Sequence, residues 1–309
     1  KSTEFFETTR QKKNFMYEGV APLAKKPSSL KRLSKIPIKA FSILKAEYQY
    51  LAQHYYTDNH IPDVLSANLY RSILNPIRTK YIHRKLAKVF VSERDLTSME
   101  YIFYPLHTEP EVSLLVYSRP YLNQIEVIRN LSFNVPVGMN VLVKEHPSSI
   151  GKRPLSFYKK IMEIPNVRLA DPYIKSQVLT DHSKLVATLS GSISLEAILR
   201  GKLVVCLSPS TLTILSETMI RYVNDLSTLG FAISDLLENA EFQEHEIINL
   251  IAAIMTESAP INWYSTILGR AGVFKPEDGS DRLYELEIER LAEYTTSRFR
   301  QLLMSKAAS

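Results

Sequence analysis

The chain has 309 residues, of which 45% are hydrophobic and 23% charged. These proportions are ordinary for a globular protein with a sizeable core, and the length suggests about two domains. The single cysteine, Cys206, excludes a disulfide framework and disfavours a cysteine-based zinc site. Because it lies in an apolar run, we interpret it as a small buried hydrophobe in a reducing compartment. No apolar run approaches the ~20 residues of a membrane-spanning helix.

The formal charge of +6 is unevenly distributed along the chain. Residues 1–90 carry 17 Lys and Arg against 6 Asp and Glu, and the densest basic cluster lies between Lys25 and Lys35. A basic N-terminal part suggests an anionic partner, which could be an anionic membrane surface, a charged glycan or nucleic acid. A solvated helix face is the simpler alternative.

The N-terminal part, residues 1–95, is expected to be helical and irregular. Apolar residues recur at helical spacing over 38–54. Asp63 can cap a second helix that runs towards Pro76, and a third, strongly basic helix is expected over 78–90. Strands do not alternate with helices in this part, so it does not predict a Rossmann-like domain.

Short apolar runs alternate with helical stretches from about residue 100 onwards. We expect strands at 101–104, 140–143, 167–169, 184–188 and 203–207, and helices at 121–131, 156–163 and 192–200. Such alternation predicts an α/β fold with a parallel sheet and right-handed crossovers. The strands are apolar throughout, as is typical of strands covered on both faces.

The chain after Pro209 is expected to be mainly helical. Amphipathic stretches cover 233–237 and 244–255, and a long helix is expected over 284–303. We therefore divide the chain into a basic helical region (1–95), a Rossmann-like domain (96–275) and a C-terminal helix (276–309). With only nine glycines, the sequence has no glycine-rich phosphate loop of the Rossmann or P-loop type.

Polar motifs follow three of the expected strands, where a parallel sheet binds its ligands. The first is Ser190-Gly191-Ser192, which opens a helix that contains Glu196. A helix N-terminus offers free N–H groups to a phosphate, and Glu196 can accept from ribose hydroxyls. The alternative is helix capping, with Ser192 as the N-cap residue and Glu196 as a first-turn acid.

The second motif is Lys144-Glu145-His146-Pro147, in which Pro147 ends the strand. His146 could donate a hydrogen bond to a phosphate or protonate a leaving oxygen. Lys144 or Arg153 could pair with an anionic substrate group. A structural role for a histidine at a strand end is the alternative.

The third motif is the loop from Pro105 to Glu111, which holds His107, Glu109 and Glu111. Two acids in one tight loop can have pKa values that are pushed apart, so one could act as a general base or as a nucleophile in glycosyl transfer. Solvated loop acids are the alternative. Because all three motifs follow strands, they can face one crevice.

In their order, these motifs resemble bacterial capsule and lipopolysaccharide glycosyltransferases that use CMP-Kdo, the retaining β-Kdo transferases and their capsule-synthesis relatives. The resemblance covers roughly residues 100–210. It rests on the segments Tyr104–Glu111, Val143–Pro147, Asn166–Pro172, Ser190–Ser192 and Gly201–Lys202, with Gly151, Arg153, Tyr158 and Glu196. The His146-Pro147 pair is also similar to bacterial sialyltransferases, which use CMP-sialic acid.

The resemblance implies a GT-B-like fold whose donor site lies in the Rossmann-like domain. It implies that His146 contacts the CMP phosphate and assists its departure. Ser190, Gly191 and Ser192 would hold the phosphate or the ribose, and Glu196 the ribose hydroxyls. The N-terminal part departs from the family pattern, since a GT-B enzyme has a second Rossmann-like domain there.

For the chemistry, the resemblance implies that Glu111 is the nucleophile of a double displacement, with Glu109 as the second choice. Lys144 or Arg153 would meet the carboxylate of the donor sugar. No metal and no further cofactor are expected, because a CMP-sugar has one phosphate and a good leaving group without a cation.

The implied donor is therefore a CMP-sugar, and the acceptor a cell-surface glycan or glycolipid. The expected location is cytoplasmic, at the inner face of the membrane, with the basic N-terminal region on the anionic lipid surface and no nucleic acid partner. The alternatives are a GT-B enzyme that uses a UDP-sugar or CMP-sialic acid, a related epimerase, and a non-catalytic basic scaffold that binds membrane or nucleic acid.

Overall fold

The computed structural model describes residues 1–11, 74–109, 111, 113–259, 261 and 280–307. The expected helix at 38–54 and the basic cluster between Lys25 and Lys35 lie outside these residues. Most of the helix expected from Asp63 towards Pro76 lies outside them too.

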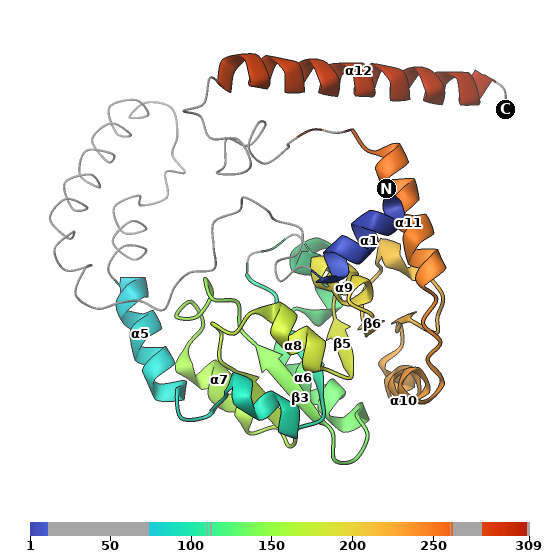
Figure 1. The fold of residues 1–309 in the computed structure, drawn as a ribbon. Coiled ribbons are helices and arrows are strands. Elements are labelled where there is room, and N and C mark those ends of the chain that lie inside the picture. Colours follow the sequence, from blue (N-terminus) through green and yellow to red (C-terminus); the bar gives the residue numbers. More distant parts are fainter. Residues whose placement is uncertain (12–73, 110, 112, 260, 262–279, 308–309) are drawn as a thin grey trace, which may run out of the picture.

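A parallel sheet of seven strands forms the centre of the described part (Figure 1). Its strands are β1 (Phe90–Val91), β2 (Tyr101–Pro105), β3 (Asn140–Lys144), β4 (Val167–Ala170), β5 (Leu185–Thr188), β6 (Leu203–Cys206) and β7 (Ile220–Tyr222). Their spatial order is β1-β4-β3-β2-β5-β6-β7, and every pair is parallel. The predicted α/β class with a Rossmann-like parallel sheet is confirmed.

Helices cover both faces of this sheet. They are α1 (Ser2–Gln11), α5 (Asn75–Leu86), α6 (Gln124–Asn134), α7 (Leu155–Met162), α8 (Ser176–His182), α9 (Ser192–Leu199), α10 (Leu229–Asn239) and α11 (Glu244–Glu257). The last helix, α12 (Ser280–Ala307), lies away from the sheet (Figure 1). Alternate side chains of each strand meet different helices. In β2, Ile102 and Tyr104 join the core formed by α5, α6, α7 and α10, whereas Tyr101 and Phe103 join the core formed by α1, α8, α9 and α11.

All five predicted strands are present, and helices are found at each of the stretches expected between residues 121 and 303. The interpretation of the chain after Pro209 as mainly helical is wrong at β7 (Ile220–Tyr222), which pairs with β6. The third basic helix ends at Leu86, because Phe90 belongs to β1 and pairs with Leu169 of β4. The domain boundaries at 95 and 275 stay predictions.

The two ends of the chain lie against the same helix, α11. Phe6 of α1 is fully buried in the core that α11 shares, and Arg10 pairs with Glu244. At the other end of α11, the backbone carbonyl of Glu257 accepts a hydrogen bond from Tyr294 of α12. None of the described helices has the length and apolar character required to cross a bilayer.

Candidate active site

The strand order places a topological switch point between β2 and β5. With β1 set aside, β4-β3-β2-β5-β6-β7 is the order 3-2-1-4-5-6 of a dinucleotide-binding domain. From β2 the chain proceeds one way to β3 and β4, and from β5 it proceeds the other way to β6 and β7. The loops that leave β2 and β5 therefore diverge, and the rule for parallel sheets places a ligand crevice at their carboxyl ends. The three predicted motifs follow β2, β3 and β5.

The loop after β5 prepares the N-terminus of α9. Gly191 is the N-cap residue, and its φ of 140° lies in the region that favours glycine. Inside the first turn, Ser194 Oγ donates to the Gly191 carbonyl over 2.6 Å, and no side chain caps the helix. The predicted alternative, with Ser192 as the N-cap, is thus wrong. The uncapped N–H groups and the exposed Ser192 are available to an anion.

His107 joins the loop after β2 to the loop after β5. Its side chain is 8% exposed, and its Nδ1 lies 3.5 Å from Glu111 Oε2. The ring packs on the glycine turn, since a Cβ added to Gly191 would lie 3.7 Å from His107 Cε1. The other ring nitrogen, Nε2, is buried without a hydrogen-bond partner among the described residues. Glu111, which also accepts from Thr108 Oγ1 over 3.3 Å, is thereby placed beside the turn.

Four side chains hold the loop after β2 in place, and we call Gln124, Glu145, Arg153 and Tyr158 the clamp. The Gln124 amide accepts from His107 N over 2.9 Å and donates to the His107 carbonyl over 3.1 Å. Arg153 Nη2 donates to the same carbonyl over 2.6 Å. The loop backbone around His107 is therefore fixed from two sides.

The clamp also engages one of the two loop acids. Glu109 Oε1 accepts from Arg153 Nη2 and from Gln124 Nε2, each over 2.9 Å. A carboxylate bonded in this way is a weaker nucleophile, because its lone pairs are shared with donors. Glu109 thus anchors the loop, and the prediction that Glu111 is the nucleophile stays a prediction.

Arg153 is held in turn by a buried carboxylate. Its Nη1 donates to Glu145 Oε2 over 2.5 Å, Tyr158 Oη donates to the same oxygen over 3.0 Å, and the guanidinium lies 4.9 Å from the ring centroid of Phe157. Burial raises the pKa of Glu145, and Arg153 and Tyr158 oppose the rise. With both ends of its guanidinium engaged, Arg153 acts here as a positioning residue, and its predicted contact with the donor stays a prediction.

His146 stands exposed at the mouth of the crevice. Its Nδ1 lies 2.7 Å from Ser148 Oγ and accepts from Ser148 N over 3.2 Å. Because Nδ1 is an acceptor, the proton of the neutral ring is on Nε2. Desolvation by the surrounding protein and the nearby Lys144 and Lys152 lower the pKa of His146, and Glu111 opposes this. Near neutral pH the ring is therefore a neutral Nε2–H donor.

Pro147 turns the chain immediately after His146. The backbone N–H of Ser149 donates to the His146 carbonyl over 2.8 Å, which closes a turn with Pro147 at its second position. Glu145 Oε1 accepts from the His146 N–H over 2.8 Å. The turn and the clamp together fix the direction in which the imidazole ring points.

Lys144 and Glu196 lie on the opposite side of the sheet from the clamp and are 4% and 9% exposed. Burial lowers the pKa of Lys144 to about 8, against the opposing effect of Glu145, Asp171 and Glu196. Burial raises the pKa of Glu196, while a hydrogen bond from Gln177 lowers it. Glu196 Oε1 is buried without a partner in the described part of the chain, so it can accept from a ligand hydroxyl.

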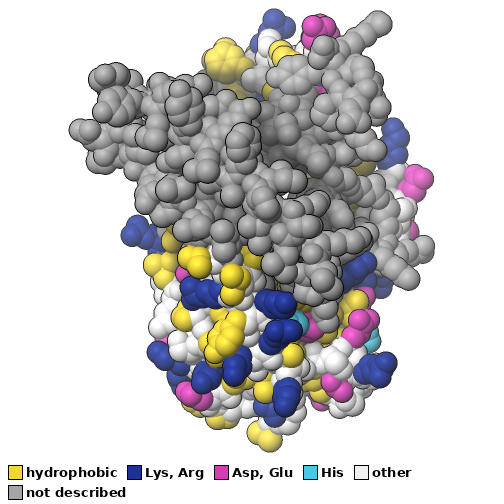
Figure 2. Space-filling model, turned by 90° about the vertical axis from the view of Figure 1, so that its left-hand side faces the viewer, with side chains coloured by type: hydrophobic (Ala, Val, Ile, Leu, Met, Phe, Trp, Pro, Cys, Tyr) yellow, Lys and Arg dark blue, Asp and Glu magenta, His cyan; other side chains and the backbone are white. Residues whose placement is uncertain are grey.

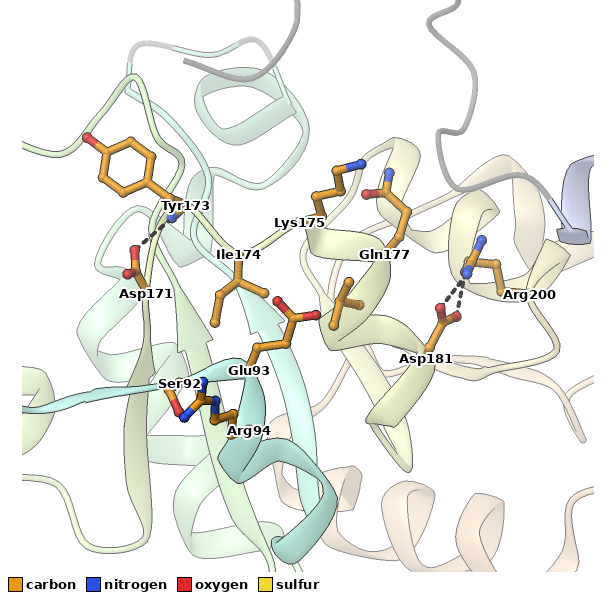
Figure 3. A pocket seen from close by; sticks show the side chains of 11 residues that line it. Ser92, Glu93, Arg94, Asp171, Tyr173, Ile174, Lys175, Gln177, Asp181 and Arg200 are labelled. Atoms are coloured by element: carbon orange, nitrogen blue, oxygen red, sulfur yellow. Dashed lines mark hydrogen bonds and ion pairs between the residues drawn. The ribbon is translucent and has the colours of Figure 1, made fainter. Parts of the chain in front are cut away.

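A hollow of about 920 Å³ opens next to Glu196 at the end of β4 (Figure 3). Gln177, which bonds Glu196, lines it together with Asp171, Tyr173, Lys175 and Arg200. In Figure 3 the side chains of Lys175, Gln177 and Arg200 stand along its rim on α8 and α9. The predicted residues do not line this hollow, although Asp171 belongs to a segment that carried the family resemblance.

The structure thus brings Glu111, His146 and the Ser190–Ser192 turn to one crevice, with Lys144 and Glu196 on one side of it. Ser190 joins the loop that follows β2, since its Oγ lies 3.5 Å from Ser118 Oγ. Sequence reasoning missed Gln124. The available signal was a polar residue on the buried stripe of a helix, one turn before Val127 and Ile128.

A metal site was not expected, and that expectation stays a prediction. Within the described ranges, no group of three or more His, Cys, Asp or Glu side chains is arranged to hold a metal ion. Cys206, predicted to be a buried hydrophobe, is fully buried in β6, and burial raises the pKa of its thiol to about 12.

Comparison with known sequences identifies the protein family to which the chain belongs. The family described as "Capsule polysaccharide biosynthesis protein" matches residues 20–214, more than half of the chain. Protein FixF of Sinorhizobium fredii (strain NBRC 101917 / NGR234) is 26% identical over 154 residues, which are 46% of this chain and 35% of FixF. The chain thus spans about a third of the length of that relative.

Solved structures with a similar arrangement include three enzymes. A "beta Kdo 2,7 transferase", KpsC of Thermosulfurimonas dismutans, is 14% identical with a TM-score of 0.34, covering 62% of this chain and 68% of that one. A putative UDP-N-acetylglucosamine 2-epimerase of Listeria monocytogenes is 18% identical with a TM-score of 0.36 (53% and 46% covered). The UDP-GlcNAc 2-epimerase of Methanocaldococcus jannaschii is 15% identical with a TM-score of 0.38 (60% and 52% covered). This chain spans about half of each epimerase.

Proposed function

The chain belongs to the family of capsule polysaccharide biosynthesis proteins, and from this premise we propose that it carries the donor site of a glycosyltransferase that moves Kdo from CMP-Kdo to a glycan or glycolipid acceptor with retention. One observation carries the proposal. At the switch point of the sheet, the carboxylate of Glu111 lies beside the uncapped N-terminus of α9, and His107 packs between them.

Glu111 is the proposed nucleophile. Its carboxylate attacks the anomeric carbon of Kdo, and the bond from that carbon to the phosphate oxygen breaks with its electron pair leaving on CMP. The acceptor hydroxyl then attacks the same carbon, its proton passes to the CMP phosphate, and the bond to Glu111 breaks. Two inversions give net retention. Glu109, bonded to Arg153 and Gln124, holds the loop.

The CMP phosphate is proposed to lie between His146 and the N-terminus of α9. The Nε2–H of His146 donates to it, as do the N–H groups of the first turn and the hydroxyls of Ser190 and Ser192. These donors stabilise the negative charge that grows on the leaving phosphate. Because the pKa of His146 is lowered, its role at neutral pH is hydrogen-bond donation and not proton transfer.

Lys144 and Glu196 are proposed to recognise the rest of the donor. Glu196 accepts from the ribose hydroxyls through Oε1, which has no partner among the described residues. The cytosine ring enters the hollow beside Gln177, which adjoins Glu196. Lys144 pairs with the carboxylate of Kdo, since Arg153 is already occupied by Glu145 and Glu109.

The remaining partners follow from the family and are proposals too. The acceptor is a cell-surface glycan or glycolipid, and transfer takes place on the cytoplasmic side at the membrane. No metal takes part, because the single phosphate of CMP leaves with help from His146 and the helix N-terminus alone.

The donor can be tested by calorimetric titration of the protein with CMP and with UDP. We expect CMP to bind at least about tenfold more tightly, and His146→Ala to weaken CMP binding by roughly tenfold to a hundredfold, the range for a hydrogen bond to a charged group. Ser148→Ala is the matched control. It keeps the backbone N–H that bonds His146 Nδ1, so the imidazole ring should stay oriented and CMP binding should be unchanged. Tighter binding of UDP would favour a UDP-sugar enzyme or epimerase instead.

A further inference from the structure

Two neighbouring segments at the surface of the described protein contain cations and no acid of their own. α5 and the strand after it, from Asn75 to Ser92, contain no Asp or Glu, and neither does the segment from His146 to Met162 that includes α7. The exposed cations of these two segments are Arg84, Lys85, Lys88, Lys152, Lys159 and Lys160. We call this surface the α5–α7 face. Figure 2, which looks at this side, shows Lys and Arg side chains gathered around hydrophobic ones.

The two segments of the α5–α7 face are joined at the protein core. Ile82 and Leu86 of α5 lie in the same buried cluster as Tyr158 and Ile161 of α7. Thr79 Oγ1 donates to the Ile150 carbonyl over 2.8 Å. The cations are therefore presented by one packed surface and not by independent elements.

Apolar side chains project from the same face. Leu74, Ile77 and Tyr81 are 52%, 62% and 53% exposed and follow each other at helical spacing along α5. Lys85 lies with its Nζ 5.8 Å from the centroid of the Tyr81 ring. An exposed stripe of Leu, Ile and Tyr that continues into Arg and Lys is the pattern of a helix that lies in a membrane interface.

The α5–α7 face is also tied to the candidate active site. Gly151 belongs to the loop that carries His146 and Arg153, and its φ of 95° favours glycine. The glycine packs directly on α5, since an added Cβ would lie 2.3 Å from Thr79 Oγ1 and 2.9 Å from the Thr79 backbone. A surface that binds α5 is therefore held at a fixed position relative to His146.

We propose that the α5–α7 face binds the surface of an anionic phospholipid membrane. Its Lys and Arg side chains meet the lipid phosphates, and Ile77 and Tyr81 enter the headgroup region. Charge complementarity selects this occupant, because the exposed charges of α5 and of the segment that includes α7 are all cations, and the apolar stripe favours a bilayer over a purely polar polyanion. The inference does not depend on which nucleotide the site binds, and it would bring the crevice to an acceptor displayed on a lipid.

Vesicle flotation tests this proposal. The full chain is expected to bind vesicles of phosphatidylcholine mixed with phosphatidylglycerol and not vesicles of phosphatidylcholine alone, and added salt should weaken the binding. Each cation at an anionic membrane contributes about fivefold, so the triple variant Arg84→Gln/Lys85→Gln/Lys88→Gln should lose roughly a hundredfold. The matched control, Lys184→Gln/Arg298→Gln/Arg300→Gln, removes three exposed cations elsewhere and should bind as the wild type does.

A second variant separates the membrane from other polyanions. Ile77→Ser/Tyr81→Ser should weaken vesicle binding by a factor that salt does not change, because it removes apolar contact only. Equal binding to neutral and anionic vesicles, or an equal loss in the control, would overturn the proposal. So would binding of single-stranded nucleic acid by the wild type without vesicle binding. CMP titration of the triple variant should be unchanged, so failure here is distinct from failure of the donor proposal.

Discussion

The clamp, on the α6–α7 side of the sheet, bonds within itself and to the loop after β2, whereas Glu196, on the α8–α9 side, is bonded by Gln177 and keeps one oxygen without a partner among the described residues. The clamp side has exceptions too, since Tyr104 Oη and His107 Nε2 are buried there without a described partner. The clamp forms a closed set in which Gln124, Arg153 and Glu145 each have protein partners. Across the sheet, the Lys144 ammonium is near Glu145, Asp171 and Glu196 but has no hydrogen bond to another described side chain, and Glu196 Oε1 has no partner among the described residues. Thr188 Oγ1, at the end of β5, also lacks one.

The difference separates positioning from recognition. A satisfied buried network makes a segment rigid, and an unsatisfied buried group costs stability unless a ligand completes it. The α6–α7 side therefore sets where the loop of Glu111 lies, and the α8–α9 side offers groups for the donor. Substitutions on the two sides should have different consequences, and the following variants are chosen to expose that contrast.

The largest expected effect concerns the two acids of the loop after β2. Glu111→Gln should lower the rate of Kdo transfer by a factor on the order of a thousand, because the amide cannot form the glycosyl intermediate, while CMP affinity is unchanged. Glu109→Gln is the matched control. Its amide oxygen can still accept from Arg153 and Gln124, so a loss of no more than about tenfold is expected in the same single-turnover assay. Equal losses in both variants would contradict the assignment.

Replacing Arg153 of the clamp should lower the stability of the folded protein. Arg153→Met leaves the Glu145 carboxylate buried without its cation, which costs about 3–5 kcal/mol of the free energy of unfolding. Burial without the cation raises the pKa of Glu145 further, so the folded state binds a proton more tightly than the unfolded state and the loss should shrink as pH falls. Urea unfolding at several pH values measures both effects.

A compensating change provides the control for the clamp. The double variant Arg153→Met/Glu145→Gln removes the charge together with its partner and should recover much of the lost stability, with no remaining dependence on acid pH. If the double variant is as unstable as Arg153→Met alone, the loss comes from packing against Phe157 and not from the ion pair.

The contrast between the two sides also marks what the sequence could predict. The strands were recognisable because β2, β3, β5 and β6 are apolar throughout, and the rule for parallel sheets then placed the motifs after β2, β3 and β5 at one edge. β7 was not predicted, because it has only three residues and Ile220 is the one that is buried. A run of that length carries no periodicity.

The clamp and the burial of Lys144 could not be predicted, because they depend on contacts between distant segments. Arg153 reaches the His107 carbonyl across 46 positions of the chain, and Lys144 is buried on the face that α8, an unpredicted helix, helps to cover. Lys144 and Arg153 were equal candidates for the donor carboxylate at the level of residue type. Their contacts differ, since the Arg153 guanidinium bonds Glu109 and Glu145, whereas the Lys144 ammonium has no hydrogen bond to another described side chain.

The smallest expected effect is the pH dependence of KM, which tests whether Lys144 binds the donor carboxylate. The pKa of Lys144 is lowered by burial to about 8, so its ammonium is mostly charged at pH 7 and mostly neutral at pH 9. If it pairs with the donor carboxylate, the KM for CMP-Kdo should stay constant below about pH 8 and rise above it, by up to tenfold per pH unit. Lys144→Met should have a high KM that pH does not change, whereas Lys152→Met, at an exposed lysine of the next loop, should behave as the wild type.

Stability of the ligand-free protein should depend on pH in the opposite direction. The folded pKa of Lys144 lies below the model-peptide value of 10.5, so between these values the unfolded chain binds more protons and the free energy of unfolding rises with pH. Lys144→Met should abolish this rise and stabilise the protein at neutral pH, because it removes a buried charge whose desolvation outweighs the effect of the nearby acids. If Lys144→Met keeps the pH dependence of KM seen in the wild type, Lys144 has a structural role only. Another cation would then bind the carboxylate of the donor.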